Sequence, residues 1–323
     1  MDILRYLYSA FDTSNMTWFT FVPDWVVPDI VVLLLGAVTI GFIVKKEQRP
    51  LPILLEMFCF VFLYASVYEN MATVMGWYGY GQSLVMVFNV PLSVPLIEAL
   101  FVYTGLRLAL KMRIPDVARV ALVGCFGTLA DLTLDPLALS QVHGGIGRWS
   151  WYIAQGDANI FGAPVYNYTG WFILCGYAAA MILIGRRWHQ RSGYKRWVGI
   201  AYPPLCLLGA LVIMVSPLST FMLWLGPFFA KGGATEWVML ALTFVVLTVV
   251  LIAWRGRNHD AITWRDDWIV PVVFGVFYLT NLVFDLIGSR WSILAFSLPF
   301  VAIHAGILWA AFWTGRRASK AAT

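Results

Sequence analysis

The sequence predicts an all-α membrane protein, a polytopic transmembrane helical bundle of about eight or nine spans. Of its 323 residues, 60% are hydrophobic and 12% are charged, whereas a soluble domain carries roughly 25% charged residues. Apolar runs of about 18 to 25 residues recur from residue 26 onward, and such runs cross a hydrocarbon core of ~30 Å as helices. This composition requires lipid as the solvent.

The apolar runs predict nine spans in order along the chain. They cover residues 26–44, 51–75, 82–106, 118–138, 166–185, 197–215, 235–254, 268–287 and 291–313. No linker or repeat divides them, so residues 26–315 are predicted to form a single transmembrane domain. Residues 1–25 are predicted to be an interfacial segment, and residues 316–323 a basic cytoplasmic tail. The apolar stretch 221–230 is predicted to be an interfacial or re-entrant piece.

The positive charge is distributed in a way that predicts the orientation. Of the 22 cations, 18 follow the first, third, fifth, seventh and ninth spans. An excess of Lys and Arg marks cytoplasmic loops, so we expect an outside N-terminus and a cytoplasmic C-terminus in the plasma membrane. The net charge of +5 therefore reflects the orientation of the chain in the membrane, and no nucleic-acid partner is expected.

The candidate carboxylates inside the predicted spans are Glu56, Glu69, Glu98, Asp131, Asp135 and Asp285. A carboxylate at the centre of a membrane helix costs ~2.5–3.5 kcal/mol on insertion scales, and it usually faces the bundle interior and serves a function. Glu56 lies near the cytoplasmic edge, where Lys45 or Lys46 could pair with it. Asp285 lies near the outer edge beside Arg290, so a structural role is expected for both acids.

The other four acids predict a polar pocket. Asp131 and Asp135 are four residues apart, so they share one helix face in the outer half of the fourth span. Glu69 falls at a similar depth in the second span. Glu98 is expected nearer the cytoplasmic half of the third span, after two prolines that would interrupt its helix. Burial and a neighbouring carboxylate both favour the neutral acid, which can then donate a proton to a weakly basic substrate.

Aromatic residues gather in the predicted outer loops. Three sequences carry them: GWYGYG (76–81), GRWSWY (147–152) and VYNYTGW (165–171). Aromatic belts anchor most membrane proteins at the interface. The functional alternative is that some of these rings line a pocket for an unsaturated ligand and face a carbocation. The candidate substrate-binding residues are Tyr80, Trp149, Trp151, Tyr168, Asn70, Asn89 and Asn167.

No metal site or cofactor is expected. The four cysteines, Cys59, Cys125, Cys175 and Cys206, lie inside spans without metal-ligand spacing. The four histidines are scattered along the chain.

Five sequences resemble the membrane-integral carotenoid hydratase family, which includes the γ-carotene 1′-hydroxylase and bisanhydrobacterioruberin hydratase types. They are, in order, VYENMATVMGWYGYG, NVPLSVPLIEAL, ADLTLDPLA, GRWSWY and FGAPVYNYTGW. The resemblance covers roughly residues 50–185 and is weaker through the C-terminal spans.

The resemblance implies cofactor-free addition of water to the terminal C1=C2 bond of an acyclic carotenoid, a long polyene of the lycopene or γ-carotene class. Such a site needs a buried acid, an ordered water, a base and aromatic shielding. Asp131 or Asp135 would be the acid and Glu69 its partner or the base, with Glu98 and Asn89 in support.

Three alternatives remain open from the residues alone. The Asp131–Asp135 spacing is also found in prenyltransferases, although those sites bind magnesium diphosphate beside cytoplasmic cations. A carotenoid cyclase would use the same protonation. A proton-coupled transporter would also contain intramembrane acids and broken helices.

Overall fold

The computed structural model describes residues 22–143, 145–153, 157–216 and 234–321. Most of the predicted interfacial segment 1–25 and the whole of the predicted piece 221–230 lie outside these residues. Within them, nine helical stretches are long and apolar enough to cross a membrane. The predicted all-α class is confirmed, and the chain is a multi-pass membrane protein.

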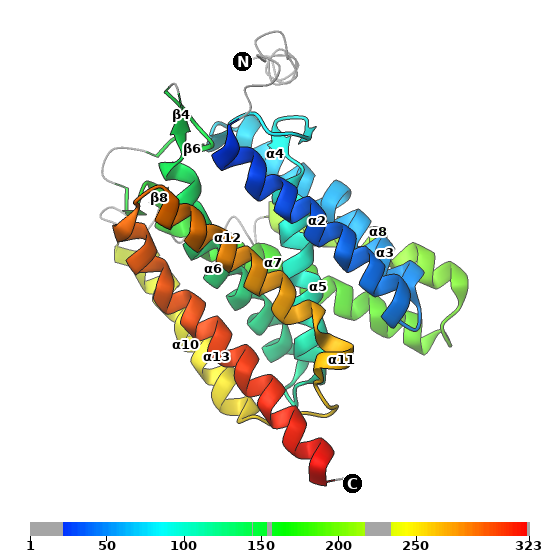
Figure 1. Cartoon of the computed structure of the whole chain (residues 1–323). Helices are drawn as coiled ribbons and strands as arrows, with labels where there is room; N and C mark the ends of the chain where they lie inside the picture. Colours follow the sequence, from blue (N-terminus) through cyan, green and yellow to red (C-terminus); the bar gives the residue numbers. More distant parts are fainter. Residues whose placement is uncertain (1–21, 144, 154–156, 217–233, 322–323) are drawn as a thin grey trace.

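The spanning helices follow one another along the chain (Figure 1). They are α2 (Pro23–Lys46), α3 (Pro50–Cys59) continued by the π-helix η2 (Phe60–Ala65) and α4 (Ser66–Val74), α5 (Ser93–Lys111), α6 (Asp116–Ser140), α7 (Val165–Arg191), α8 (Arg196–Val215), α10 (Ala234–Trp254), α12 (Ile269–Ile287) and α13 (Trp291–Ala321); α11 (Trp264–Asp267) is a short helix before α12.

Short strands lie between the helices. They pair as four two-stranded antiparallel ribbons: β1 (Tyr78–Tyr80) with β6 (Trp149–Trp151), β2 (Met86–Val87) with β3 (Val90–Pro91), β4 (Val142–His143) with β5 (Ile146–Gly147), and β7 (Asn159–Ile160) with β8 (Ala163–Pro164). We call the end of the bundle that carries β1 and β6 the aromatic end. The opposite end, with α11 and the loops after α2, α5 and α7, is the basic end (Figure 1).

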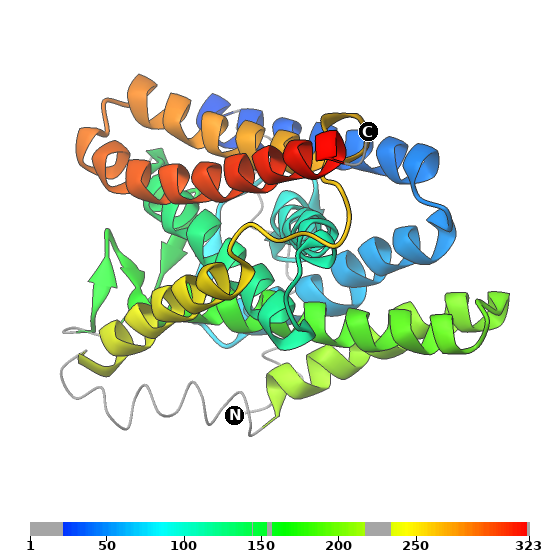
Figure 2. The ribbon, with the colours of Figure 1, turned by 90° about the horizontal axis from the view of Figure 1, so that it is seen from below.

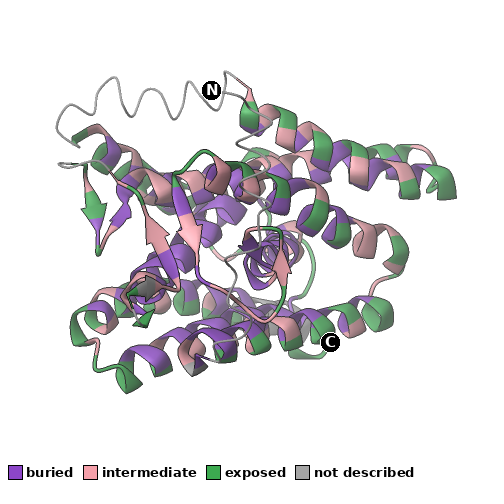
Figure 3. Ribbon diagram, turned by 90° about the horizontal axis from the view of Figure 1, so that it is seen from above, coloured by how far each residue is buried: buried purple, intermediate pink, exposed green. Residues whose placement is uncertain are grey.

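Helix α5 runs through the centre of the bundle. Seen along its axis, it is surrounded by the other helices (Figure 2), and it is buried on nearly every side (Figure 3). It is the most buried of the spans. Glu98 lies on this helix. Its side chain is therefore held inside the protein and not in lipid.

The third span begins later than the sequence predicts. Residues 82–92 form a loop with the ribbon β2–β3, and α5 starts at Ser93. The apolar residues of this loop resemble a membrane run, but Pro91 lies in β3 and Pro95 in the first turn of α5, where a missing amide hydrogen costs nothing. Glu98 therefore lies in the second turn of α5, toward the aromatic end, and not in the opposite half as expected.

Helices α6 and α7 approach each other closely because two glycines face α7. A Cβ on Gly124 would lie 2.7 Å from the carbonyl oxygen of Phe172, and one on Gly127 would lie 2.7 Å from the sulfur of Cys175. Thr128 adds a hydrogen bond of 2.9 Å across this contact, to the carbonyl oxygen of Tyr168. This close packing brings the acids of α6 within reach of α7.

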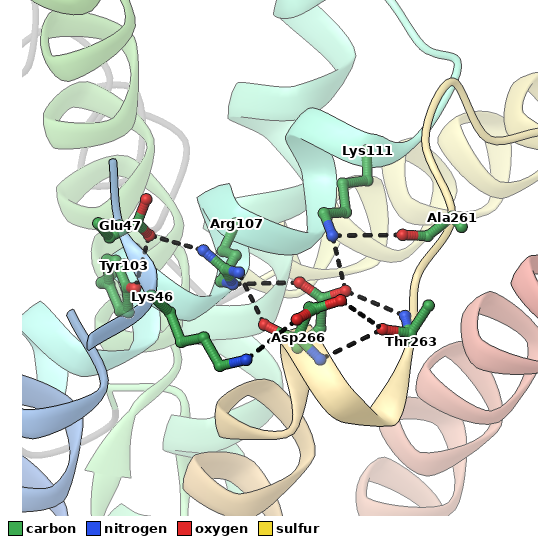
Figure 4. A network of polar contacts seen from close by, with 9 residues as sticks. Lys46, Glu47, Tyr103, Arg107, Lys111, Ala261, Thr263 and Asp266 are labelled. Atoms are coloured by element: carbon green, nitrogen blue, oxygen red, sulfur yellow. Dashed lines mark hydrogen bonds and ion pairs between the residues drawn. The ribbon is translucent and has the colours of Figure 1, made fainter. Parts of the chain in front are cut away.

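Ion pairs hold the helices together at the basic end (Figure 4). Arg107 on α5 donates to Glu47 at 2.6 Å, and Lys111 on the same helix contacts Asp267 at 2.6 Å. The partner of Glu56 is not the one expected from the sequence. Glu56 accepts two hydrogen bonds from Arg186 of α7, at 2.8 and 2.6 Å, and not from Lys45 or Lys46.

Candidate functional site

Four buried carboxyl groups from three neighbouring helices gather near the aromatic end. The Glu69 side chain lies on α4, and the residue is 5% exposed. Glu98 lies on α5, and Asp131 and Asp135 lie on α6; all three are fully buried. The π-helix η2 directly precedes α4, and such local widenings of a helix are frequent at functional sites.

Glu69 is held by two tyrosines. The hydroxyl groups of Tyr78 and Tyr80 both donate to its Oε2 atom, at 2.7 and 2.5 Å. Burial and the nearby carboxylate raise the pKa of both tyrosine hydroxyls well above their ordinary value. The two tyrosines therefore stay protonated and act as hydrogen-bond donors that fix the position of Glu69.

The ribbon β1–β6 carries four aromatic side chains over the carboxyl groups. Its register places Tyr78 opposite Trp151 and Tyr80 opposite Trp149. Because side chains alternate along a strand, all four rings point to the same face. The ring centroids of Tyr78 and Trp151 are 4.5 Å apart, and those of Tyr80 and Trp149 are 4.9 Å apart. Two aromatic sequences that are far apart in the chain thus form one wall of the site.

Asp131 and Asp135 are joined by an amide from α7. The Nδ2 atom of Asn167 donates to an Oδ2 atom of each aspartate, at 2.7 Å in both cases. The indole nitrogen of Trp151 donates to the same oxygen of Asp135 at 3.2 Å. The Oδ1 atom of each aspartate is buried and has no hydrogen-bond partner among the described residues, which leaves two acceptor positions inside the site.

Glu98 lacks a donor from the other described residues. Both of its carboxyl oxygens are buried without such a partner, and its carboxyl group faces that of Glu69. Asp131 and Asp135 face each other in the same way. The site therefore contains two pairs of buried carboxyl groups, Glu69 with Glu98 and Asp131 with Asp135.

An apolar groove lies beside this site, between α2, α5, α6 and α12, and none of the four acids is among its lining residues. Its cavity volume is about 40 Å³. The groove is lined mainly by aliphatic side chains such as those of Val32, Leu35 and Ile97. Its inner wall includes Tyr80, whose hydroxyl binds Glu69, and Trp149. A hydrophobic ligand in the groove would thus touch residues that contact the acids.

Residues 29–231 match the family of carotenoid biosynthesis proteins. The chain belongs to this family. The matched residues include all four carboxyl groups, the ribbon β1–β6 and α7. No curated protein and no solved structure gave a match. Family membership gives the chain a role in carotenoid biosynthesis.

The structure brings some of the predicted substrate-binding residues to the acids and keeps others away. Asn167 and Trp151 contact the aspartates, as described. The amide of Asn70 donates to the carbonyl oxygens of Ser66 and Val87 and accepts from the backbone amide of Asn89. These contacts attach the loop 82–92 to α4. Tyr168 is fully buried on α7, and its hydroxyl has no partner among the described residues.

The residues that the sequence did not single out include a polar cluster in the lining of the groove. Asp29 on α2 is buried and accepts hydrogen bonds from Ser83 and from Ser93, the latter at 2.6 Å. Arg148 approaches Asp29 at 3.4 Å and donates to Gln141 at 3.0 Å. Asp29 was a detectable signal, since it is an acid inside the first predicted span. Its partners are far apart in sequence and could not be found by spacing.

The chemistry available at the site is proton transfer. The described residues contain no group of three or more His, Cys, Asp or Glu side chains arranged to hold a metal ion. What they do contain is four buried carboxyl groups, hydrogen-bond donors that orient three of them, and aromatic rings beside an apolar groove.

Proposed function

We propose that the chain is a carotenoid hydratase, which adds water across the terminal C1=C2 double bond of an acyclic carotenoid end group. The observation that carries this proposal is the group of four buried carboxyls beside an apolar groove. Family membership supports a carotenoid as the substrate. The activity is that of a hydro-lyase working without a cofactor, with water and a polyene of the lycopene or γ-carotene class as reactants.

The first step is protonation of the alkene. The acid of the Asp131–Asp135 pair gives its proton to C2, and the electron pair of the C1=C2 bond forms the new C2–H bond. This leaves a tertiary cation at C1. The burial of both aspartates supports this role, because a desolvated carboxyl group favours the neutral form that can donate.

The second step is capture of the cation by water. A lone pair of the water oxygen forms the C1–O bond, and Glu69 or its partner Glu98 takes the proton that this oxygen releases. One acid has then lost a proton and another has gained one. Return of this proton from the Glu69–Glu98 pair to the Asp131–Asp135 pair restores the site after each turnover.

The aromatic wall protects the cation. The rings of Tyr80 and Trp149 both line the groove, and the negative face of an aromatic ring attracts a cation. Such shielding also limits the access of stray nucleophiles to C1. We place the aromatic end on the outer side of the plasma membrane, because the loops at the opposite end carry most of the cations.

Expression in a lycopene-producing bacterium tests the proposal. The expected product is heavier than lycopene by one water for each end that reacts. Unchanged lycopene would contradict the proposal. A product of unchanged mass with absorption at shorter wavelength would instead indicate a cyclase, which quenches the same cation internally.

The acid assignment is tested with isosteric variants. Asp131→Asn and Asp135→Asn should leave membrane insertion intact, and at least one of them should abolish turnover. Asp285→Asn is the matched control, because Asp285 is equally buried but lies on α12 outside the carboxyl cluster. If both cluster variants keep full activity, the acid assignment is wrong.

A further inference from the structure

A second cavity opens at the basic end of the bundle, away from the carboxyl site. Its cavity volume is about 500 Å³. The chain segments around it are the loop between α2 and α3, the start of α6, and the end of α7 with the start of α8. Its basic lining residues are Lys46, Arg49, Arg119, Arg186, Arg187 and His189. The proposed hydration of a neutral polyene does not involve this cavity.

Carboxylates balance only part of the positive charge around the cavity. Arg186 is bound by Glu56. Lys46 contacts Asp266 at 3.1 Å. Arg107, outside the lining, is already paired with the lining acid Glu47 (Figure 4).

Three arginines of the lining, Arg49, Arg119 and Arg187, therefore provide the surplus charge. Arg119 and Arg187 share one carboxylate, that of Asp116. Arg49 has no carboxylate within ion-pair distance among the described residues; its guanidinium lies 3.5 Å from the ring centroid of Tyr194. A guanidinium stacked in this way keeps its edge available for an anion. Arg49 thus supplies one positive charge that no carboxylate of the described residues neutralises, and Arg119 and Arg187 together supply a second, since these two cations share one carboxylate.

The surroundings of the cavity indicate the level of the lipid headgroups. Trp188 and Trp197, at the adjacent ends of α7 and α8, are 38% and 60% exposed and contact each other edge to face. Exposed tryptophans mark the membrane interface. Pro52, Ile53 and Leu183 add apolar surface to the lining. A cavity at this level can receive a charged headgroup while the attached chains stay in the bilayer.

We propose that this cavity binds the phosphate group of an anionic phospholipid, with Arg49 and Arg187 as its principal contacts. Basic pockets between membrane helices on the cytoplasmic side suit such headgroups. The same phosphate chemistry could come from a soluble anion. The apolar lining and the flanking tryptophans favour the lipid, and the inference does not depend on the hydratase reaction.

The test is lipid binding by the purified full-length chain in a neutral detergent. Native mass spectrometry measures the affinity for dioctanoyl phosphatidylglycerol, for dioctanoyl phosphatidylcholine and for inorganic phosphate. We expect phosphatidylglycerol to bind more tightly than phosphatidylcholine, with an affinity that falls as salt is added. In the double variant Arg49→Gln and Arg187→Gln, affinity for phosphatidylglycerol should fall about 25-fold, or about fivefold for each cation removed.

The controls separate the cavity from the general charge of this end. Arg257→Gln with Arg265→Gln removes two exposed cations that do not line the cavity, and binding should not change. Arg49→Lys keeps the charge and should bind better than Arg49→Gln, a comparison that remains valid if the double variant fails to fold. Equal binding of the two lipids, or wild-type binding by the double variant, would overturn the proposal. Tight binding of inorganic phosphate that phosphatidylglycerol does not displace would assign the cavity to a soluble anion and reject the lipid.

Discussion

Asn167 offers a direct test of how the acid pair is held. Its Nδ2 atom contacts both aspartates at 2.7 Å. Asn167→Leu keeps a similar volume and removes the donor. Asp135 would keep the indole nitrogen of Trp151 at 3.2 Å, whereas the Oδ2 atom of Asp131 would have no remaining donor in the described part of the chain. An orphaned buried acceptor costs about 1–3 kcal/mol, so we expect a lower Tm in detergent and a displaced Asp131.

The effect on turnover can be worked from the same contact. A hydrogen bond to a charged group contributes about 1.5–3 kcal/mol, which corresponds to roughly a tenfold to hundredfold loss of rate if it is needed in the transition state. Turnover is measured as pigment conversion in a carotene-producing bacterium, normalised to the amount of protein in the membrane. Thr128→Val is the matched control, since it removes another buried contact between α6 and α7 without touching the acids. Wild-type turnover by Asn167→Leu would refute this account of the acid pair.

Two further substitutions test the wall and the packing around the site. Tyr80→Phe removes the 2.5 Å hydrogen bond to Glu69 and should lower turnover about tenfold or more, while Tyr64→Phe, which removes a buried hydrogen bond outside the wall, should not. Because burial raises the pKa of the Tyr80 hydroxyl, the loss should be the same at neutral and mildly alkaline pH; an effect that disappears on raising the pH would contradict this role. Gly124→Ala should lower stability by about 1–3 kcal/mol through overpacking, as seen in Tm, whereas Gly170→Ala meets no atom within 4 Å and should be tolerated; equal Tm values would show that the contact between α6 and α7 can relax.

Much of the fold could be predicted because the membrane constrains it strongly. Apolar runs of the right length can only be helices in lipid, and eight of the nine predicted spans begin within a few residues of the observed helices. The third span was wrong because hydropathy alone does not distinguish an apolar loop inside a protein from a membrane helix. The error placed Glu98 in the wrong half of the bundle, although the sequence had grouped it with Glu69 in one polar pocket.

The candidate site was predictable in its residues but not in their partners. An acid in an apolar run is visible in the sequence, and the spacing of Asp131 and Asp135 places them on one helix face. The pairing of two aromatic sequences as the ribbon β1–β6 depends on contacts between distant segments, which no local pattern encodes. The same holds for the pairing of Glu56 with Arg186, where proximity in sequence favoured the wrong cation.

The measurement that tests the central claim most directly is isotope labelling of the product. Membranes containing the wild-type chain would be supplied with lycopene, in the absence of dioxygen, in water enriched in heavy oxygen and, separately, in deuterium. The account predicts a tertiary alcohol at C1 whose oxygen comes from water, with one deuterium bound to C2 that does not exchange. A product that forms only with dioxygen, or an alcohol without deuterium at C2, would contradict it.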